Sequence, residues 1–524
     1  MTAWVIPAVH TPLLEQLAAL LPERGAHGWF VGGYVRDLLR GVPGSDLDIV
    51  VDGPAITLAR EFADQTGGAF VLLDETTDAA RIVFPVAAEQ PLVLDLVRLR
   101  APTITEDLQL RDFTINALAV SLKRATASGF TDEQLIDVTN ARADLVAGRI
   151  RMCGPTALSD DPLRLLRAVR FAAQLGFAID GATDAAIRRY AALIDEVARE
   201  RVRDELLKLL AAAQAAPYLR YLDDVRLLTR IIPELEAARD CAQPSQHFLP
   251  VLDHLLETVA AAEWLLARLG GERPENNVAE TLTDQDLRLP MAARRYPQLT
   301  AELEDPSLLR ERMAQTMLGG QPRSVFFKVA ALLHDVGKPQ TKQVRPDGRI
   351  TFYGHPEVGA ELVAQIGQRL HVGREATGYL QLIVREHMRP GQLRSLGPNL
   401  TRRAIYRFWR DTDPAAPDVL LHAMCDHLAA RGPLLSLEDW EQHVAWTGTV
   451  LRESWRATET QRSTRLITGT DIMRELQIAP GPLIGRALAA VAEAQFLGEV
   501  QTRAEALALA ANIVRGDASS LIEE

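Results

Sequence analysis

Two aspartates, Asp46 and Asp48, stand one residue apart at the start of the apolar run DLDIVV. In a strand, residues i and i+2 point to the same face, so both carboxylates are expected to project together while Leu47 and Ile49 pack behind them. Two carboxylates on one face repel each other unless a cation lies between them, and Mg²⁺-like cations take oxygen ligands beside phosphates. The pair therefore predicts a metal site for phosphate chemistry, with a solvated strand end as the plainer alternative.

Other residues near this pair fit the same chemistry. Gly32 and Gly33 allow backbone N–H groups to approach a phosphate without a Cβ clash. Arg36 follows one helical turn later, where its guanidinium can meet the same phosphates. Asp95, in the apolar run PLVLDLVRL, is a candidate third carboxylate. Two divalent ions held by such a trio can activate an attacking hydroxyl and stabilise a leaving pyrophosphate.

A second group of residues offers imidazole and carboxylate ligands. It comprises His254, the adjacent His334 and Asp335 of LLHDVGKP, His355, His387 and Asp426. A single histidine on an apolar helix is usually a packed or surface residue, but this ordered set favours a metal site. Such ligands suit Mn²⁺ or Ni²⁺ and hold Mg²⁺ less tightly. A metal there turns water into a nucleophile for a phosphoester.

The chain that must position these groups has 524 residues, which predicts several domains. Hydrophobic residues make up 47% and charged residues 24%, a balance typical of globular proteins. No apolar run reaches the ~18 residues of a membrane span, and the first twenty residues lack a signal-peptide pattern. The three cysteines share no metal-like spacing. We expect a cytoplasmic protein that does not bind membranes.

The pattern of hydrophobic residues changes along the chain. Residues 1 to about 145 mix strand-like runs with helical stretches, which predicts an α/β or α+β N-terminal part. From about residue 146 the strands are expected to stop. Stretches such as DPLRLLRAVRFAAQLGF carry apolar residues at i, i+3, i+4 and i+7, so helices are predicted to the end of the chain.

Several motifs together resemble one family. GGYVRD (32–37), the two aspartates, LRDFTINALA (110–119) and DDPLRLLRAVRFAAQLGF (160–177) resemble the bacterial (class II) tRNA CCA-adding nucleotidyltransferases and poly(A) polymerases. The C-terminal stretch LITGTDIMRELQIAPGPLIGRALAAVAEAQFLGEVQTRAEAL is similar to that family's tail. The resemblance implies an α+β fold of four parts: a polymerase-β-like nucleotidyltransferase palm (1–145), an all-α neck and body that binds the base and tRNA (146–240), an inserted all-α HD domain (241–435) and a helical RNA-binding tail (436–524).

The same resemblance implies roles for individual residues. Asp46 and Asp48 match the Mg²⁺-binding catalytic carboxylates, with Asp95 as the third. The nucleotide-binding candidates are Gly32, Gly33, Arg36 and Asp37 of the phosphate motif, Arg111, Asp112 and Asn116 of the RRDFTxNA motif, and Asp161, Arg164, Arg167 and Arg170 on the following helix. The chain departs from the family pattern at Leu110, where the family has arginine, and at Asp160, where it has glutamate.

Asp161 and Arg164 match the family's base-reading pair, and their chemistry suits that role. A carboxylate and a guanidinium offer opposite hydrogen-bonding characters to the Watson–Crick edge of a base. They can accept from the amino group shared by C and A and donate to the adjacent ring nitrogen. U and G present the reverse pattern and would remain unpaired. As an alternative, DDPLR is a helix N-terminus with an Asp cap and an early proline, and both readings can hold together.

The second ligand group resembles the HD superfamily of metal-dependent phosphohydrolases. By this resemblance His254, His334, Asp335 and Asp426 form the primary metal site, and His355 and His387 complete a second one or bind phosphate. Lys338 is expected to neutralise substrate charge. The remaining histidines of this region are interpreted as structural: His247, His371, His422 and His427. A polar residue often found four positions before the first ligand histidine is replaced here by Pro250.

The resemblance implies an enzyme that adds CMP to tRNA 3′ ends from CTP and ATP, with release of pyrophosphate, and that also hydrolyses phosphoesters. Residues 142–230 hold 15 basic and 12 acidic residues in a chain of net charge −12, which favours a groove that binds the RNA backbone. Asp95 and Arg111 are 16 residues apart, a shorter stretch than the family's flexible loop. This favours CC addition over full CCA addition, unless another segment replaces the loop.

Three alternatives remain open. A poly(A) polymerase of this family usually carries a basic GRRF-like stretch and a basic tail, whereas this chain ends in SSLIEE. The chain could instead act mainly as a phosphohydrolase of nucleotides or cyclic nucleotides, although intact Asp46, Asp48, Asp161 and Arg164 argue against a relict transferase. A non-catalytic RNA-binding protein would not need two complete ligand sets.

Overall fold

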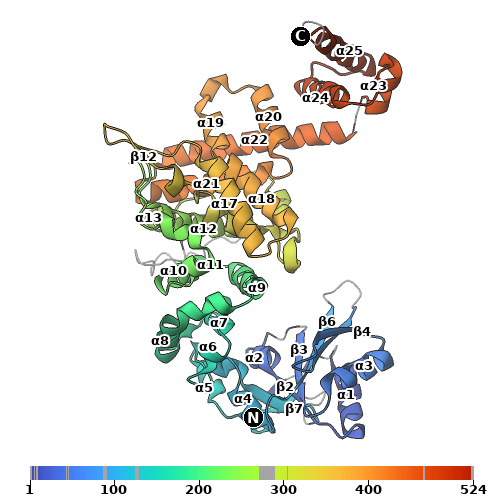
Figure 1. The fold of residues 1–524 in the computed structure, drawn as a ribbon, viewed down its shortest axis with the longest axis vertical. Helices are drawn as coiled ribbons and strands as arrows, with labels where there is room; N and C mark the ends of the chain where they lie inside the picture. Colours follow the sequence, from blue (N-terminus) through green and yellow to red (C-terminus); the bar gives the residue numbers. More distant parts are fainter. Residues whose placement is uncertain are drawn as a thin grey trace. The chain divides into compact units, whose positions relative to one another are not determined.

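The computed structural model describes residues 3–4, 6–7, 10–42, 44, 46–85, 91–123, 129–270, 289–303, 305–463 and 466–520 (Figure 1). Contacts divide the chain into two units. Unit 1 holds Met1–Ala212 and Tyr221–Ile231, and unit 2 holds Ala213–Arg220 and Ile232–Glu524. The predicted α+β class is confirmed, since unit 1 contains a large sheet and helices dominate the described remainder.

The sheet of unit 1 has seven strands in the order β4-β5-β6-β3-β2-β7-β9. Their bounds are β2 (Gly28–Val31), β3 (Asp46–Val51), β4 (Ala69–Asp74), β5 (Ala79–Phe84), β6 (Leu92–Arg98), β7 (Leu118–Ser121) and β9 (Leu135–Asp137). Strands β3 and β6 are parallel, and the other neighbours are antiparallel. The two strands that carry the predicted catalytic aspartates therefore lie side by side.

The alternation predicted for DLDIVV is confirmed. Leu47 and Ile49, each 1% exposed, share a core with apolar residues of the flanking helices α1 (Thr11–Glu23), α2 (Gly32–Leu39) and α3 (Ala55–Thr66). Val50 instead belongs to a smaller cluster with Val31 and Ala119. One face of the sheet thus carries the main core, and the opposite face presents Asp46 and Asp48.

Short helices complete unit 1. They are α4 (Ile104–Gln109), α5 (Ala141–Val146), α6 (Ala157–Asp160), α7 (Leu163–Leu175), α8 (Gly181–Tyr190), α9 (Arg199–Leu210) and α11 (Leu228–Ile231). The prediction that strands stop near residue 146 is wrong in detail, because the described residues beyond that point include four short strands: β10 (Arg149–Ile150), β11 (Ala178–Ile179), β12 (Gln343–Val344) and β13 (Ile350–Thr351). Two residues are too few to show an alternating pattern. A further short pair joins β1 (Ala3–Trp4) to β8 (Phe130–Thr131).

Unit 2 is built mainly from helices. These are α12 (Val251–Leu269), α13 (Met291–Arg295), α14 (Pro306–Ala314), α15 (Arg323–Leu333), α16 (Lys338–Thr341), α17 (His355–Arg369), α18 (Arg374–Glu386), α19 (Arg389–Ser395), α20 (Arg402–Thr412), α21 (Ala416–Arg431) and α22 (Leu437–Ser463). The last three helices, α23 (Gly469–Leu476), α24 (Pro482–Leu497) and α25 (Arg503–Ser520), share a hydrophobic core of their own.

One helix, α10 (Ala216–Asp224), contributes residues to both units. On the unit 2 side, buried Glu263 accepts hydrogen bonds from the backbone N–H groups of Ala215 and Ala216, at 2.6 and 3.1 Å. On the unit 1 side, the Tyr221 hydroxyl donates to Asp184 Oδ1 at 2.7 Å. Neither unit is therefore a single continuous piece of the chain.

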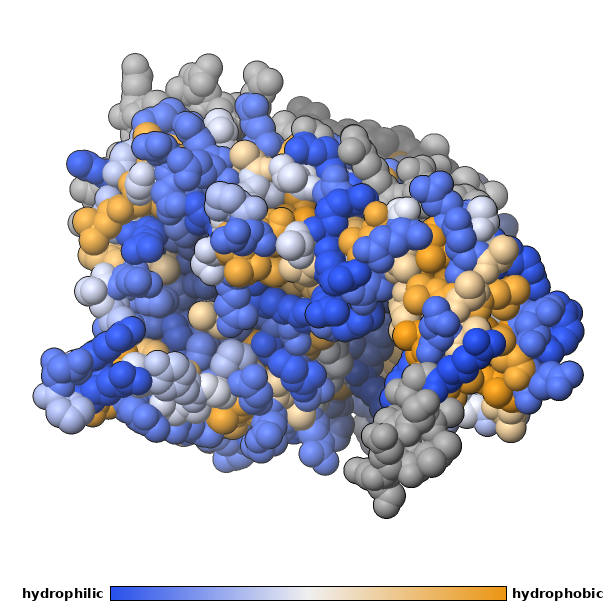
Figure 2. All heavy atoms as spheres, turned by 90° about the horizontal axis from the view of Figure 1, so that it is seen from above, coloured by the Kyte–Doolittle hydropathy of each residue, from blue (hydrophilic) through white to orange (hydrophobic). Residues whose placement is uncertain are grey.

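Hydrophilic residues cover most of the face drawn in Figure 2, and hydrophobic residues gather in smaller groups between them. Within the described part of the chain, no helix combines the length and the apolar character needed to cross a bilayer.

Candidate active sites

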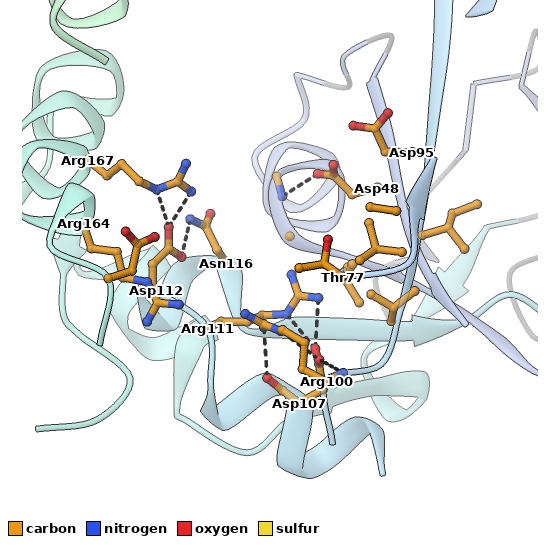
Figure 3. A pocket seen from close by; sticks show the side chains of 18 of the residues that line it. Asp48, Thr77, Asp95, Arg100, Asp107, Arg111, Asp112, Asn116, Arg164 and Arg167 are labelled. Atoms are coloured by element: carbon orange, nitrogen blue, oxygen red, sulfur yellow. Dashed lines mark hydrogen bonds and ion pairs between the residues drawn. The ribbon is translucent and has the colours of Figure 1, made fainter. Parts of the chain in front are cut away.

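The predicted catalytic carboxylates meet on one face of the unit 1 sheet. Asp48 on β3 pairs directly with Asp95 on the parallel strand β6, and Asp46 lies one pleat earlier on the same face of β3. Figure 3 shows the carboxylates of Asp48 and Asp95 side by side. The backbone N–H of Gly33 donates to Asp48 Oδ2 at 3.1 Å, which orients that carboxylate.

The electrostatics of this acidic row fit a divalent cation. Burial and the neighbouring Asp95 raise the pKa of Asp48 to about 6, because the ionised acid is poorly solvated and repelled. A cation between the carboxylates would remove that cost, and a donor set made only of oxygens suits Mg²⁺. Asp95 already has one cationic partner, since Arg81 donates to its two oxygens from Nε at 2.7 Å and Nη2 at 2.9 Å.

The two glycines lie where α2 begins. Gly32 has φ +64°, a left-handed conformation that favours glycine. A Cβ added to it would lie 3.1 Å from Asp48 Oδ2 and 3.4 Å from Arg111 Nη1, so a side chain would crowd the space between them. The N-terminus of α2 thus presents backbone N–H groups beside the acidic row, in an arrangement that suits phosphate binding.

A cavity of about 560 Å³ extends from the acidic row to the start of α7. Eleven of the predicted site residues line it: Gly32, Gly33, Arg36, Asp48, Asp95, Arg111, Asp112, Asn116, Asp161, Arg164 and Arg167. Three other predicted residues, Asp46, Asp37 and Arg170, are not among its lining residues. Asp37 accepts hydrogen bonds from Arg36, and Arg170 donates to Glu205 Oε2 at 2.5 Å.

The residues of the RDFTIN stretch form a buried polar network in this cavity. Asn116 accepts from Arg36 Nη1 at 2.7 Å and donates to Asp112 Oδ1 at 3.2 Å. Asp112 also accepts from Nη2 of Arg167 at 2.6 Å (Figure 3). Although burial alone would raise the pKa of Asp112, Arg167 and the other donors lower it to about 2. Asp112 is therefore an anion that holds Arg167 and Asn116 in place.

The predicted base-reading residues lie at the N-terminal end of α7. Asp161 accepts from Arg201 of α9, with Nη2–O distances of 3.1 and 3.3 Å. Arg164 donates to the backbone carbonyls of Ala157 and Leu110, each at 3.1 Å. The N–H of Leu163 also approaches Asp161 Oδ1 at 3.3 Å, a long contact of the kind expected for the helix-cap alternative. Both side chains line the same cavity, so a base placed there meets an acceptor and a donor.

Asp107 is a site residue that sequence reasoning missed. It is fully buried on α4 and accepts from the backbone N–H of Arg100 at 3.0 Å and from Arg111 Nη2 at 3.1 Å (Figure 3). Thr103 and Glu106 form a capping box at the start of α4. The T-x-x-E spacing is a sequence signal for such a helix start, and it could have predicted the helix. The arginines Arg98, Arg100 and Arg201 also line the cavity without having been predicted.

The second ligand set assembles inside unit 2. Its members come from α12 (His254), the end of α15 (His334 and Asp335), the start of α17 (His355), the end of α18 (His387) and α21 (Asp426). Oδ2 of Asp335 lies 3.4 Å from Nε2 of His254 and 3.2 Å from Nε2 of His334. Its other oxygen, Oδ1, lies 3.2 Å from Nε2 of His355 and 3.5 Å from Nε2 of His387.

Backbone carbonyls orient three of these histidines. Nδ1 lies 3.0 Å from Ala331 O in His334, 2.8 Å from Phe352 O in His355, and 2.7 Å from Val384 O in His387. An N–H at Nδ1 satisfies each carbonyl and leaves the Nε2 lone pair directed at Asp335. The triads His254–His334–Asp335 and Asp335–His355–His387 each bring three ligand atoms within 4.8 Å of one another, which fits two metal ions that share Asp335.

The surroundings of this cluster place further groups beside it. His247, interpreted from the sequence as structural, forms a third possible ligand group with His254 and Asp426. Lys338 Nζ lies 2.5 Å from Asp335 Oδ2. A cavity of about 1070 Å³ opens on the cluster and is lined by His247, Lys338 and four of the predicted ligands: Asp335, His355, His387 and Asp426.

Close backbone packing holds the two halves of the ligand set together. A Cβ at Gly337 would lie 2.3 Å from the backbone oxygen of His355 and 2.6 Å from the nitrogen of Gly359. Only glycine allows this approach of the segment after Asp335 to α17. The HDVGK motif thus requires its glycine for backbone packing.

Comparisons with known families agree with this division of chemistry. The chain matches the poly A polymerase head domain over residues 28–151 and the RNA and SrmB binding site of polymerase A over 176–239. It also matches the HD domain over residues 308–431 and tRNA nucleotidyltransferase domain 2 over 440–511. The acidic row on β3 and β6 lies within the range of the poly A polymerase head domain. The histidine cluster around Asp335 lies partly within the range of the HD domain.

Individual relatives cover nearly the whole chain. An A-adding tRNA nucleotidyltransferase of Deinococcus radiodurans is 34% identical and covers 91% of this chain and 93% of its own length. A CC-adding tRNA nucleotidyltransferase of Geobacter sulfurreducens is 30% identical, with 95% and 94% covered. The Thermotoga maritima CCA-adding enzyme, solved with tRNA, shares the fold with a TM-score of 0.56 at 20% identity, covering 98% of this chain and 97% of that one.

A sheet with paired carboxylates and a helical HD domain define a nucleotidyltransferase that carries an HD domain. The chain belongs to the bacterial family of tRNA nucleotidyltransferases and poly(A) polymerases. It is therefore an enzyme of that family, and divalent metals are the usual cofactors of both of its domain types.

Proposed function

We propose that this chain adds CMP residues to the 3′ ends of tRNA, using CTP and releasing pyrophosphate. The observation that carries this proposal is the acidic row of Asp46, Asp48 and Asp95 beside the N-terminus of α2. The test is to incubate the protein with tRNAs that end in -N, -C and -CC and with each NTP separately. Incorporation of CMP into tRNA, and of no nucleotide into an unrelated RNA, supports the proposal.

In the proposed reaction the RNA 3′-hydroxyl attacks the α-phosphate in line with the leaving pyrophosphate. The three carboxylates would hold Mg²⁺, which when bound would supply activation of the hydroxyl and stabilisation of the leaving group. The N-terminal turn of α2 at Gly32 and Gly33 lies beside the triphosphate and binds it together with Arg36, while the Gly33 N–H orients Asp48. Arg111 and Asn116 bind the ribose and phosphates. Two residues behind the cavity wall, Asp37 and Arg170, hold Arg36 and α7 in place.

The base-reading role is proposed for Asp161 and Arg164, whose side chains line the cavity together. Arg164→Ala removes the donor and leaves the carboxylate, so the pairing pattern that rejects U and G is lost. The preference for CTP over UTP is expected to fall by about 100-fold. The measurement is the ratio of kcat/KM values for each NTP with the same tRNA.

The matched control for this prediction is Arg199→Ala, because Arg199 lies on α9 and donates to the carbonyl of Asp195. This variant is expected to keep the NTP preference. If Arg164→Ala rejects UTP and GTP as strongly as the wild type does, Asp161 and Arg164 serve as a helix cap rather than as base readers.

The segment between β6 and Arg111 supports the proposal of a CC-adding subtype. This segment is short and contains the capped helix α4. The buried Asp107 of that helix accepts hydrogen bonds from Arg100 and Arg111, which flank the helix. Adapting the site from C to A requires movement, which such a segment opposes. We therefore propose that CC is added efficiently and that a partner enzyme adds the terminal A.

The prediction is that A addition to tRNA-CC with ATP alone is slower than C addition to tRNA-N with CTP by about 100-fold. Single-turnover rates with the two labelled tRNAs measure it. Efficient conversion of tRNA-CC to tRNA-CCA by the purified protein would instead establish full CCA addition. Long homopolymers of A made on any RNA would favour the poly(A) polymerase alternative.

A second function is proposed for the cluster around Asp335. The two histidine pairs and Asp426 suit Mn²⁺ or Ni²⁺, and Mg²⁺ less tightly, and a metal bound there supplies activated water for phosphoester hydrolysis. The positive charge of Lys338 neutralises the substrate phosphate. The four-part division into palm, neck, HD domain and tail is proposed on the same basis, and so is a cytoplasmic location, where tRNA and the nucleotides are found.

A further inference from the structure

Arg81 on β5 is bound to a carboxylate that the proposed reaction needs. In the register of the sheet, Arg81 pairs directly with Asp95, and Asp95 pairs directly with Asp48. Residues that pair across strands share a face. A guanidinium and two carboxylates therefore form a row across β5, β6 and β3, and the fork of Arg81 occupies both oxygens of Asp95.

The residues next to this row differ between its two ends. Gly32, Gly33 and Arg36 lie on the β2 side of Asp48 and line the cavity, whereas Arg81 lies on the β5 side of Asp95 and is not among the cavity's lining residues. In an in-line displacement the attacking and leaving oxygens lie on opposite sides of the phosphorus. If the pyrophosphate leaves toward Arg36, the RNA end approaches from the side of Arg81.

The chemistry of Arg81 allows it to change partners. A guanidinium fork matches a phosphate as well as a carboxylate, and the Arg81 side chain is 42% exposed and so accessible from solvent. Asp95 is also one of the three carboxylates that lie together on this face. While Arg81 occupies Asp95, that carboxylate is less available to a metal ion.

We propose that Arg81 neutralises Asp95 in the enzyme free of substrate and moves to a backbone phosphate at the RNA 3′ end when RNA binds. RNA binding then releases Asp95, so RNA and the metal ion promote each other's binding. The inference rests on the proposed nucleotidyltransferase function, but its metal-binding part can be tested without any turnover.

The first test measures metal binding in the absence of RNA. Arg81→Ala frees Asp95 and removes a positive charge, so Mn²⁺ followed by electron paramagnetic resonance is expected to bind this site about five times more tightly than in the wild type. Asp335→Ala is introduced into all proteins to remove the second centre from the signal. Arg24→Ala is the matched control, since Arg24 forms a surface pair with Glu61 in the same unit, and it is expected to change nothing. Unchanged or weaker Mn²⁺ binding in folded Arg81→Ala overturns the proposal.

The second test uses the native metal centre and steady-state kinetics. In Arg81→Ala the KM for tRNA is expected to rise about tenfold while the KM for CTP stays within about twofold, because only the RNA loses a contact. Arg81→Lys keeps the charge and is expected to recover part of the loss. Equal effects on both substrates would overturn the RNA contact. A wild-type protein that adds nothing to any tRNA would instead refute the proposed function, with the Mn²⁺ result still readable.

Discussion

Replacement of Asp48 by alanine is expected to abolish nucleotide addition, with a loss of about 10³-fold or more, and to leave phosphoester hydrolysis within about twofold. Asp48 lies between Asp46 and Asp95 on the sheet face and accepts from Gly33, so its loss dismantles the centre of the acidic row. The ligands around Asp335 belong to a separate set and remain intact. Incorporation of labelled CTP into tRNA and hydrolysis of bis(p-nitrophenyl) phosphate measure the two activities.

Asp52→Ala is the matched control for this prediction. Asp52 directly follows β3, is exposed, and bonds to the backbone N–H and ring of His27. It is expected to keep both activities. If Asp48→Ala loses both activities while retaining the wild-type circular dichroism spectrum and melting temperature, two independent sites are ruled out.

Asp335→Ala is expected to eliminate metal-stimulated hydrolysis of a 2′,3′-cyclic nucleotide, by about 10³-fold or more, while CMP addition continues. One oxygen of this carboxylate faces His254 and His334, and the other faces His355 and His387. Its removal therefore takes a ligand from both halves of the cluster at once. Hydrolysis is measured with Mg²⁺, Mn²⁺, Ni²⁺ and Co²⁺ in turn.

Asp347→Ala is the control for the hydrolase centre, because Asp347 is an exposed turn residue that bonds to the backbone of Arg349. Hydrolysis is expected to be unaffected in this variant. A wild-type protein that is inactive with all four metals would show that the ligand set does not support hydrolysis, whatever the Asp335 variant does.

Local sequence patterns predict much of the candidate nucleotidyltransferase site. The alternation in DLDIVV separates Asp46 and Asp48 from the core residues Leu47 and Ile49, and this separation depends only on the period of a strand. The two glycines before a helix follow equally from local backbone requirements. The position of Asp95 is harder to predict, because its register opposite Asp48 depends on which strands pair.

Residues whose partners lie far away in the sequence could not be predicted in the same way. Arg81 meets Asp95 only because β5 and β6 are neighbours, and Arg201 meets Asp161 only because α9 packs near the start of α7. His247 precedes α12 and has no helical period to reveal it, yet it lies with two predicted ligands. Such contacts depend on tertiary packing, and no local sequence pattern reveals them.

The division of α10 between the two units has a consequence for the order in which the chain can fold during synthesis. The stretch Ala213–Arg220 can bond to the carboxylate of Glu263 only after α12 has been synthesised. The stretch from Tyr221 onward packs with the N-terminal unit, where Tyr221 bonds to Asp184, and both of these residues are synthesised before α12. The N-terminal unit therefore cannot be completed by a ribosome that has translated only as far as residue 212. A gene fragment cut at that point omits a part of the unit's own packing, including the buried side chains of Leu222, Leu227, Leu228 and Ile231.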